Sequence, residues 1–374
     1  MKKRVLAGFG SALAAVALTT AAGASGGPLR PVATYSLPPR PQATYGACSV
    51  GANASYAAIG LAWARSPIPG GYDHFCRGFT LVTLRTGTRR VVVRLPLPQQ
   101  KGSWIVDEPV LIGHWLGYLH YLKSGGGPWD VEIVNLQTGA SRRLDHGGEQ
   151  GESTGLPLIT GWRNNLVWAS AGQQVNGHAV DQIHMYDPMS GTGRIVPTSH
   201  PGIRYTSASM SGPIVTFLGL THLGLANRGS DVWVKDLRTG HLRQLTHTGK
   251  ATGAVVTGSW VAWYTIGRNS VGPVIVEDLR TGRQWTAARD PAYQVTAGNG
   301  LLAWDSIYKD QWTVLDLTTG RSWTPPRLST RQGGGTMVRV QGDVIVEIAV
   351  VPASEDLGRV QVYGRRSLPS APRL

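Results

Sequence analysis

Short runs of alternating apolar and polar residues recur along the chain, and turn residues separate them. Residues 232–235 and 274–277 have the two-residue period that is typical of β-strands. A turn phrase resembling Asp-Leu-Arg-Thr-Gly follows each of these runs, and a shorter run follows the phrase. Asp or Asn can accept a hydrogen bond from the backbone two residues on, and Gly tolerates the positive φ that ends such a turn. The pattern therefore predicts a β-hairpin at each phrase.

The turn phrase recurs at a spacing that indicates a repeat architecture. Its final glycines lie 38 to 52 residues apart, which brackets the roughly 40–50 residues of β-propeller repeats. A second hairpin precedes each phrase, as in 254–264, so that each unit has four predicted strands. Large aromatic residues recur in the second strand, where we expect them to fill the space between sheets. The six phrases lie at 84–87, 135–139, 187–191, 236–240, 278–282 and 316–320, and the aromatic residues are Trp63, Trp168, Phe217, Trp263 and Trp304.

A further unit follows the last phrase. Residues 337–363 supply only three strands, and the alternating segment 32–37 near the N-terminus could supply the fourth. Closing a ring in this way would remove open sheet edges. We therefore predict an all-β fold, a single β-propeller of four-stranded blades closed by the N-terminal strand. Seven blades are favoured, and six are the alternative.

Some of these units resemble a known family. The segment 300–306 followed by 316–320, and 236–240 followed by 244–246, resemble the TolB-like, WD40-like bacterial propeller repeat. The resemblance covers roughly 44–363 and implies a β-propeller fold. Family members include periplasmic scaffolds, appended peptidase domains and a few lyases. The usual Ser-Pro-Asp-Gly turn is replaced here, as by Thr-Gly-Ser at 257–259, so the resemblance does not supply a partner.

The N-terminal region has the pattern of an export signal. A Lys-Lys-Arg run at 2–4, an apolar stretch to Ala21 and an Ala-Gly-Ala site predict a cleaved signal peptide at 1–24. An uncleaved membrane anchor is the alternative. The segment 25–43 then holds the ring-closing strand, 44–363 the propeller, and 364–374 a C-terminal tail. We expect a secreted, periplasmic or cell-wall-associated protein with no membrane span in the mature chain.

Export bears on the two cysteines of the sequence. In an oxidising compartment, Cys48 and Cys76 are expected to form one disulfide. The alternative is a pair of buried thiols that act as small apolar side chains. Neither reading predicts a catalytic thiol.

The chain is strongly basic, with a formal net charge of +14, although only 16% of its residues are charged. Nucleic acid is a poor partner for an exported protein, so an anionic glycan, a cell-wall polymer or a protein partner fits better. We expect a monomer. Arginine follows every turn phrase. These residues either form a basic rim that docks on an anionic surface or prevent edge-to-edge pairing of the outer strands with other chains. They are Arg89, Arg90, Arg142, Arg143, Arg194, Arg243, Arg283 and Arg321.

Long connections predict where a ligand would bind. They run over 66–77, 123–130, 171–182 and 219–231, and binding residues concentrate in loops longer than a hairpin needs. Their aromatic, imidazole and guanidinium groups suit a carbohydrate or another polar, anionic ligand, and the alternative is that they are solvated loop residues. The predicted ligand-binding residues in these connections are Tyr72, His74, Trp129, His178, His222 and Arg228. Tyr308, in a further loop, is predicted to bind as well.

Motifs for catalysis are not found in the sequence. It has no Gly-x-Ser-x-Gly elbow and no His-Glu-x-x-His pair, so we predict no catalytic residue, cofactor or metal. Convergence of His74, His178 and His222 on a metal is an alternative. Glu347 lies in an apolar strand, either facing the channel or, more simply, at a strand edge. The sequence favours a binding or scaffolding module, with a lyase or hydrolase of anionic polysaccharide as runner-up.

Overall fold

We analysed a computed structural model. It describes residues 33–36, 44–64, 76–95, 104–122, 128–148, 157–175, 178–196, 204–220, 230–266, 271–306, 311–324, 336–349 and 359–364. Within these ranges, no helix is long and apolar enough to cross a membrane. The predicted signal peptide and C-terminal tail fall outside them, apart from Gly364. So do the predicted binding residues Tyr72, His74, His222, Arg228 and Tyr308.

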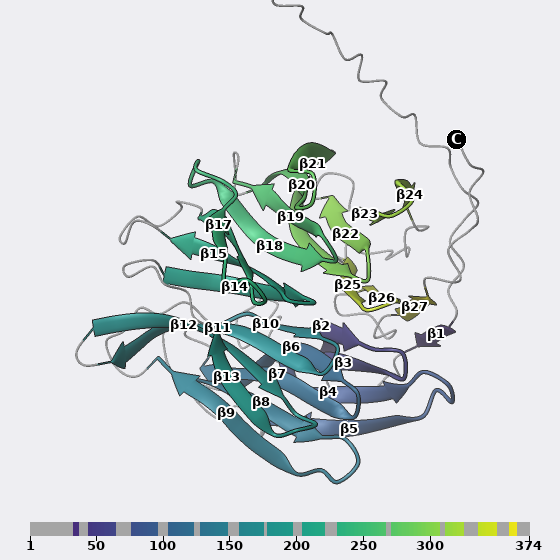
Figure 1. The fold of residues 1–374 in the computed structure, drawn as a ribbon. Helices are drawn as coiled ribbons and strands as arrows, with labels where there is room; N and C mark the ends of the chain where they lie inside the picture. The colour runs from purple at the N-terminus through teal and green to yellow at the C-terminus, as the bar shows by residue number, and fades with distance from the viewer. Residues whose placement is uncertain are drawn as a thin grey trace, which may run out of the picture.

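The described strands form six antiparallel sheets arranged around a common centre (Figure 1). The first sheet has the order β2 (Thr44–Ala52), β3 (Tyr56–Ala64), β4 (Cys76–Thr83) and β5 (Arg89–Arg94). The second has β6 (Trp104–Ile112), β7 (Trp115–Leu122), β8 (Trp129–Asn135) and β9 (Ser141–Gly147). The third has β10 (Ile159–Trp162), β11 (Asn165–Val175), β12 (His178–Asp187) and β13 (Thr192–Val196). The fourth has β14 (Arg204–Ser211), β15 (Ile214–Leu220), β16 (Asp231–Asp236) and β17 (Leu242–Gln244).

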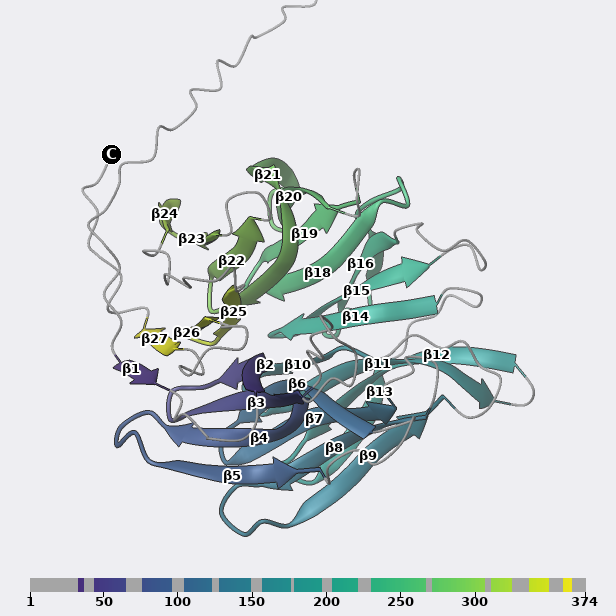
Figure 2. The same ribbon diagram turned by 180° about the vertical axis from the view of Figure 1, so that it is seen from behind.

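The last two sheets depart from this simple order. One contains seven strands, namely β18 (Ala251–Thr257), β19 (Trp260–Thr265), β20 (Gly272–Asp278), β21 (Arg283–Gly298), β22 (Leu301–Ser306), β23 (Gln311–Asp316) and β24 (Arg321–Trp323). Its long strand β21 pairs with β20 through its first part and with β22 through its second part. The sixth sheet has β25 (Thr336–Gln341), β26 (Val344–Ala349) and β27 (Arg359–Gly364), and β1 (Ala33–Ser36) pairs with β27. Figure 2 shows β1 beside β27 from behind.

The repeated phrase forms the predicted hairpin turn. In the copy between β16 and β17, the Arg238 amide donates to Asp236 Oδ1 at 2.8 Å, and the Gly240 amide donates to the Asp236 carbonyl at 2.8 Å. Gly240 has a φ of 72°, which a residue with a side chain adopts only with strain. Asn135, Asp187, Asp278 and Asp316 make the same side-chain bond in their own copies. The local chemistry of the phrase thus explains the regular spacing of the outer hairpins.

Apolar side chains pack between adjacent sheets. The aromatic residues predicted for the second strands are buried, from Phe217 at 0% exposure to Trp304 at 6%, which confirms that they fill the core; the side chain of Trp63 lies outside the described residues. Cys48 on β2 and Cys76 on β4 are joined by a disulfide within the first sheet. One predicted loop is different, because most of 171–182 belongs to β11 and β12, which extend as a hairpin.

Candidate functional site

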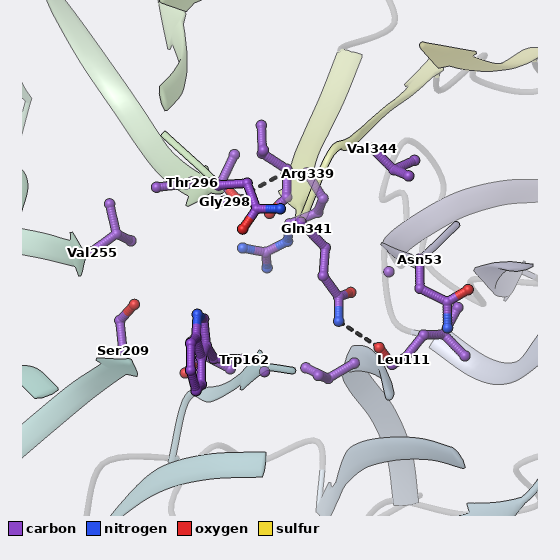
Figure 3. A pocket seen from close by; sticks show the side chains of 18 of the residues that line it. Asn53, Leu111, Trp162, Ser209, Val255, Thr296, Gly298, Arg339, Gln341 and Val344 are labelled. Atoms are coloured by element: carbon purple, nitrogen blue, oxygen red, sulfur yellow. Dashed lines mark hydrogen bonds between the residues drawn. The ribbon is translucent and has the colours of Figure 1, made fainter. Parts of the chain in front are cut away.

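The innermost strands surround a central cavity of about 410 Å³. Seven innermost strands, β2, β6, β10, β14, β18, β21 and β25, contribute most of its lining, and Val344 at the start of β26 adds to it. Side chains from several of these strands point into the cavity in Figure 3, among them Trp162, Arg339 and Gln341. The Gln341 amide crosses to the Leu111 carbonyl at 2.5 Å and so links β25 to β6.

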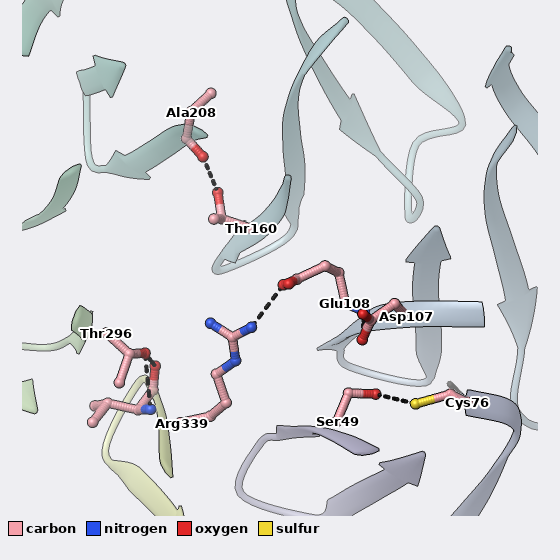
Figure 4. Close-up of polar contacts among 9 residues, drawn as sticks. Ser49, Cys76, Asp107, Glu108, Thr160, Ala208, Thr296 and Arg339 are labelled. Carbon is pink, nitrogen blue, oxygen red and sulfur yellow. Dashed lines mark hydrogen bonds and ion pairs between the residues drawn. The ribbon is translucent and has the colours of Figure 1, made fainter. Parts of the chain in front are cut away.

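Hydroxyl groups join neighbouring innermost strands directly. Thr160 on β10 donates to the Ala208 carbonyl on β14 at 2.8 Å (Figure 4). Thr296 on β21 accepts from the Val340 amide on β25 at 3.1 Å. The wall of the cavity is therefore cross-linked by hydrogen bonds, and side chains on it have fixed positions.

β-Bulges change the direction of the innermost strands at one level of the cavity. Glu108 on β6, Ser207 on β14 and Gly253 on β18 lie within register shifts and have φ values of 51°, 52° and 60°. Positive φ is costly for a residue such as Glu108, and such strain together with bulges is concentrated at functional sites. These three residues line a second hollow of about 250 Å³. It adjoins the central cavity and shares with it Glu108, Ile159, Thr160, Val255, Val295 and Arg339. We call it the bulge mouth; its other lining residues are Leu158, Ile159, Thr160, Ala208, Ala254, Val255, Tyr264, Gln294 and Val295.

An ion pair lies in the bulge mouth. Arg339 Nη2 is 2.7 Å from Glu108 Oε2, and the two side chains are 27% and 20% exposed (Figure 4). Asp107, the neighbour of Glu108, is partly buried, and burial followed by the Glu108 charge raises its pKa to about 7. The mouth thus offers a guanidinium donor and a carboxylate acceptor, whereas Asp107 does not line it.

Sequence reasoning did not identify this site. Glu108 and Arg339 lie in strands, whereas binding residues are expected in long loops. A signal was present, because Asp107 and Glu108 interrupt an otherwise apolar strand and a proline follows them. The sequence does not reveal the bulge that turns Glu108 toward the cavity, because that depends on the pairing of β6 with β7.

Two of the predicted binding residues, Trp129 and His178, fall within the described ranges, and both lie in strands. Trp129 is only 1% exposed and packs with Leu119 and Ile133 in the core, so its ring is not presented to a ligand. The reason is that β8 begins at Trp129, where the sequence pattern had indicated a loop. His178 begins β12, and its side chain lies outside the described residues.

Most arginines of the predicted rim lie on outermost strands, whereas Arg283 begins β21 within the seven-stranded sheet. Some of them contact the next sheet. Arg90 donates to the Leu136 carbonyl, Arg142 Nη1 lies 3.3 Å from the Tyr186 hydroxyl, and Arg243 Nη2 lies 2.7 Å from Glu277 Oε1. These three arginines tie one sheet to its neighbour. Arg89, Arg194 and Arg283 are exposed.

One polar cluster resembles a catalytic triad in composition but differs in geometry. Ser170 Oγ lies 2.8 Å from His184 Nε2, and Asp145 Oδ2 lies 3.7 Å from the same nitrogen. A triad needs the serine and the carboxylate on opposite nitrogens of the imidazole. Ser170 is also fully buried, and Asp145 accepts a 2.8 Å bond from Trp168 Nε1. This cluster therefore joins two sheets and is not a nucleophile with its base.

Glu347 on β26 neither faces the channel nor lies at an exposed strand edge. It is 1% exposed, and the Tyr363 hydroxyl lies 3.1 Å from its Oε2 atom. Burial raises the pKa of Glu347 to about 7. The sequence expectation was wrong because β26 packs between its sheet neighbours and the adjacent sheet, where even alternating polar positions are covered.

Comparison with solved structures identifies the fold. The chain has a TM-score of 0.53 and 11% identity to the β-propeller domain of the Trilobed protease from Pyrococcus furiosus, covering 86% of this chain and 96% of that one. The fold is a β-propeller. An oligogalacturonate lyase in complex with manganese gives a TM-score of 0.51 at 11% identity, over 92% of this propeller and 98% of that chain. TolB from Acinetobacter baumannii gives 0.44 at 12% identity, over 67% and 60%. No family model and no curated protein sequence matches the propeller.

Proposed function

We propose that this propeller is an exported, monomeric binding module of seven blades, whose ring is closed by β1. Seven innermost strands line the central cavity, and the seven-stranded sheet divides naturally into two four-strand units that share β21. The pairing of β1 with β27 gives the last unit its fourth strand. Ring closure completes the last unit and leaves only the short outer edges of the blades open, which suits a rigid scaffold outside the cell.

The ligand of this module is a polar or anionic molecule, such as a glycan or a cell-wall polymer segment, that enters the bulge mouth. The single observation that carries this proposal is the strained placement of Glu108 opposite Arg339, within a hollow that also contains Gln294 and Tyr264. Glycan hydroxyls donate to a carboxylate and accept from a guanidinium, and a tyrosine ring supplies apolar contact. The net charge of +14 favours acidic glycans and acidic wall polymers over neutral ones. A protein partner with anionic groups is the alternative ligand.

A glycan-binding screen tests this function. The purified protein is presented with acidic and neutral glycans, with and without chelator, and any bound glycan is analysed by mass. We expect retention of an intact glycan and weaker binding by Arg339→Gln and Glu108→Gln. Arg238→Gln is the matched control, because Arg238 is 72% exposed and pairs with Asp236 in an outer turn. Equal binding by all three variants would place the ligand elsewhere.

A second candidate function is cleavage of an anionic polysaccharide, as a lyase or hydrolase. It rests on Asp107, which adjoins Glu108 but does not line the bulge mouth, because a carboxyl with a pKa of about 7 can donate a proton at neutral pH. One structurally similar propeller is itself named an oligogalacturonate lyase. The same screen would then yield shortened glycan products, and Asp107→Asn would no longer form them. This result would favour cleavage over binding.

The exposed outer arginines provide a separate docking surface for polyanions in this proposal. Arg89, Arg194 and Arg283 carry it best, because their side chains are exposed on β5, β13 and the first part of β21. Affinity for a soluble polyanion should fall as salt rises, since exposed charges are screened over about 8 Å at physiological ionic strength. Binding that does not change with salt would contradict this docking role. The arginines would then serve only to prevent edge-to-edge pairing of strands.

A further inference from the structure

Three potential metal ligands lie together between β7 and β8, away from the bulge mouth. His120 on β7 is directly opposite Asp130 on β8, and Glu132 follows Asp130 by two positions on the same face of the sheet. His120 Nδ1 lies 3.3 Å from Glu132 Oε1 and 3.9 Å from Asp130 Oδ2. One ligand atom from each residue lies within 4.8 Å of the other two. The antiparallel pairing of two strands therefore brings an imidazole and two carboxylates to one point.

The remaining oxygen of each carboxylate is held by a group outside this set. The Tyr118 hydroxyl donates to Glu132 Oε2, and Arg143 Nη1 lies 3.4 Å from Asp130 Oδ1. These contacts turn Oε1 and Oδ2 toward His120 Nδ1. Outer hydrogen bonds of this kind orient the ligands in protein metal sites. The Trp104 ring lies against the imidazole, with ring centroids 4.4 Å apart, and limits its rotation.

We propose that His120, Asp130 and Glu132 bind one divalent transition-metal ion, with Zn²⁺ as the preferred ion. Two atoms that each lie about 2.1 Å from one ion are about 3.0–4.2 Å apart, so the two distances from His120 Nδ1 already fit a shared ion. An imidazole nitrogen with two carboxylate oxygens is a ligand set that Zn²⁺ accepts, whereas Ca²⁺ and Mg²⁺ prefer oxygen alone. Three protein ligands leave a further coordination position for water or a ligand group.

The charge of the cluster also suits a cation. Asp130 and Glu132 present two carboxylates to one imidazole nitrogen. Arg143 balances one of the two carboxylates, but its side chain is 61% exposed and is screened by solvent. An ion between Nδ1, Oε1 and Oδ2 would neutralise the other carboxylate where the side chains are only 16–24% exposed.

Isothermal titration of the chelator-treated full chain with ZnCl₂ tests this site. We expect one strong site per chain, a rise in melting temperature on binding, and weaker binding of CaCl₂. His120→Phe keeps a ring against Trp104 and should weaken Zn²⁺ binding at least tenfold. Glu132→Gln keeps an acceptor for Tyr118 and should do the same, which covers the case in which the first variant fails to fold.

His184→Phe is the matched control. His184 also lies against a tryptophan, Trp168, with ring centroids 5.2 Å apart, but it has one nearby carboxylate, Asp145, instead of two. This variant should bind Zn²⁺ as the unaltered protein does. Absence of a stoichiometric site, or a site that His120→Phe and Glu132→Gln leave unchanged, would overturn the proposal and leave the cluster as a charged hydrogen-bond network.

Discussion

Glu108 and Arg339 form an ion pair at 2.7 Å although 231 positions separate them in the sequence. Glu108 lies on β6 and Arg339 on β25, so the pair connects two sheets across the cavity (Figure 4). Their contact depends on the complete ring, because nothing local in either strand brings them together. The ion pair is therefore part of both the contacts that hold the ring together and the lining of the bulge mouth.

Removal of one partner should destabilise the ring. In Arg339→Gln, Glu108 keeps its charge in a mostly covered position and loses its best donor, so we expect the free energy of unfolding to fall by about 1–3 kcal/mol. Urea denaturation at pH 7 measures the change. The double variant Glu108→Gln with Arg339→Gln should recover part of the loss, because no unpaired charge remains; a further full loss would show that the two residues act independently.

Close approach of two innermost strands predicts a second effect. A Cβ atom on Gly298 of β21 would lie 2.6 Å from the Gly342 amide nitrogen in the turn after β25. Gly298→Ala must therefore push backbone away from backbone, at a cost of about 1–3 kcal/mol. Gly193→Ala is the control, since its Cβ would meet only ordinary contacts at 3.5 Å or more. Equal melting temperatures of the two variants would contradict this account of the ring.

How far the sequence predicts this molecule depends on the range of the interactions. The hairpins follow from Asp236, Gly240 and their equivalents, because a turn is fixed by neighbours a few residues away. The wedge-filling role of Trp263 follows in the same way from strand alternation. Glu108, by contrast, reaches the cavity through a bulge in the pairing of β6 with β7, and its partner Arg339 lies in another sheet. Trp129 was misassigned because a strand start and a loop end have the same local composition.

The disulfide within the first sheet should stabilise the protein. Cys48 and Cys76 are 28 residues apart, and closing a loop of this length is worth about 3 kcal/mol in the chain-entropy description. The double variant Cys48→Ala with Cys76→Ala should therefore unfold at a lower urea concentration. A reducing agent should lower the midpoint of the unaltered protein and leave that of the double variant unchanged. A reducing agent that shifts both midpoints equally would show that the effect does not come from this bond.

Burial of Glu347 predicts that stability falls as pH rises. In the folded chain this carboxyl has a pKa of about 7, whereas in the unfolded chain it ionises near 4.5. Between these values the folded state binds more protons than the unfolded state, so the free energy of unfolding decreases from about pH 4.5 through pH 7. Asp107, with a pKa also raised to about 7, acts in the same direction. Glu347 should contribute about 3 kcal/mol of the loss, with little screening by solvent because its side chain is 1% exposed.

Glu347→Gln separates this contribution from the others. The glutamine keeps an oxygen acceptor near the Tyr363 hydroxyl but has no proton to lose, so the variant should lose less stability between pH 5 and pH 8. We expect it to be more stable than the unaltered protein at pH 8 and close to it at pH 5. Urea denaturation at both pH values measures this crossover. Parallel pH profiles for the two proteins would mean that Glu347 is already ionised in the folded chain, with its charge stabilised by its neighbours.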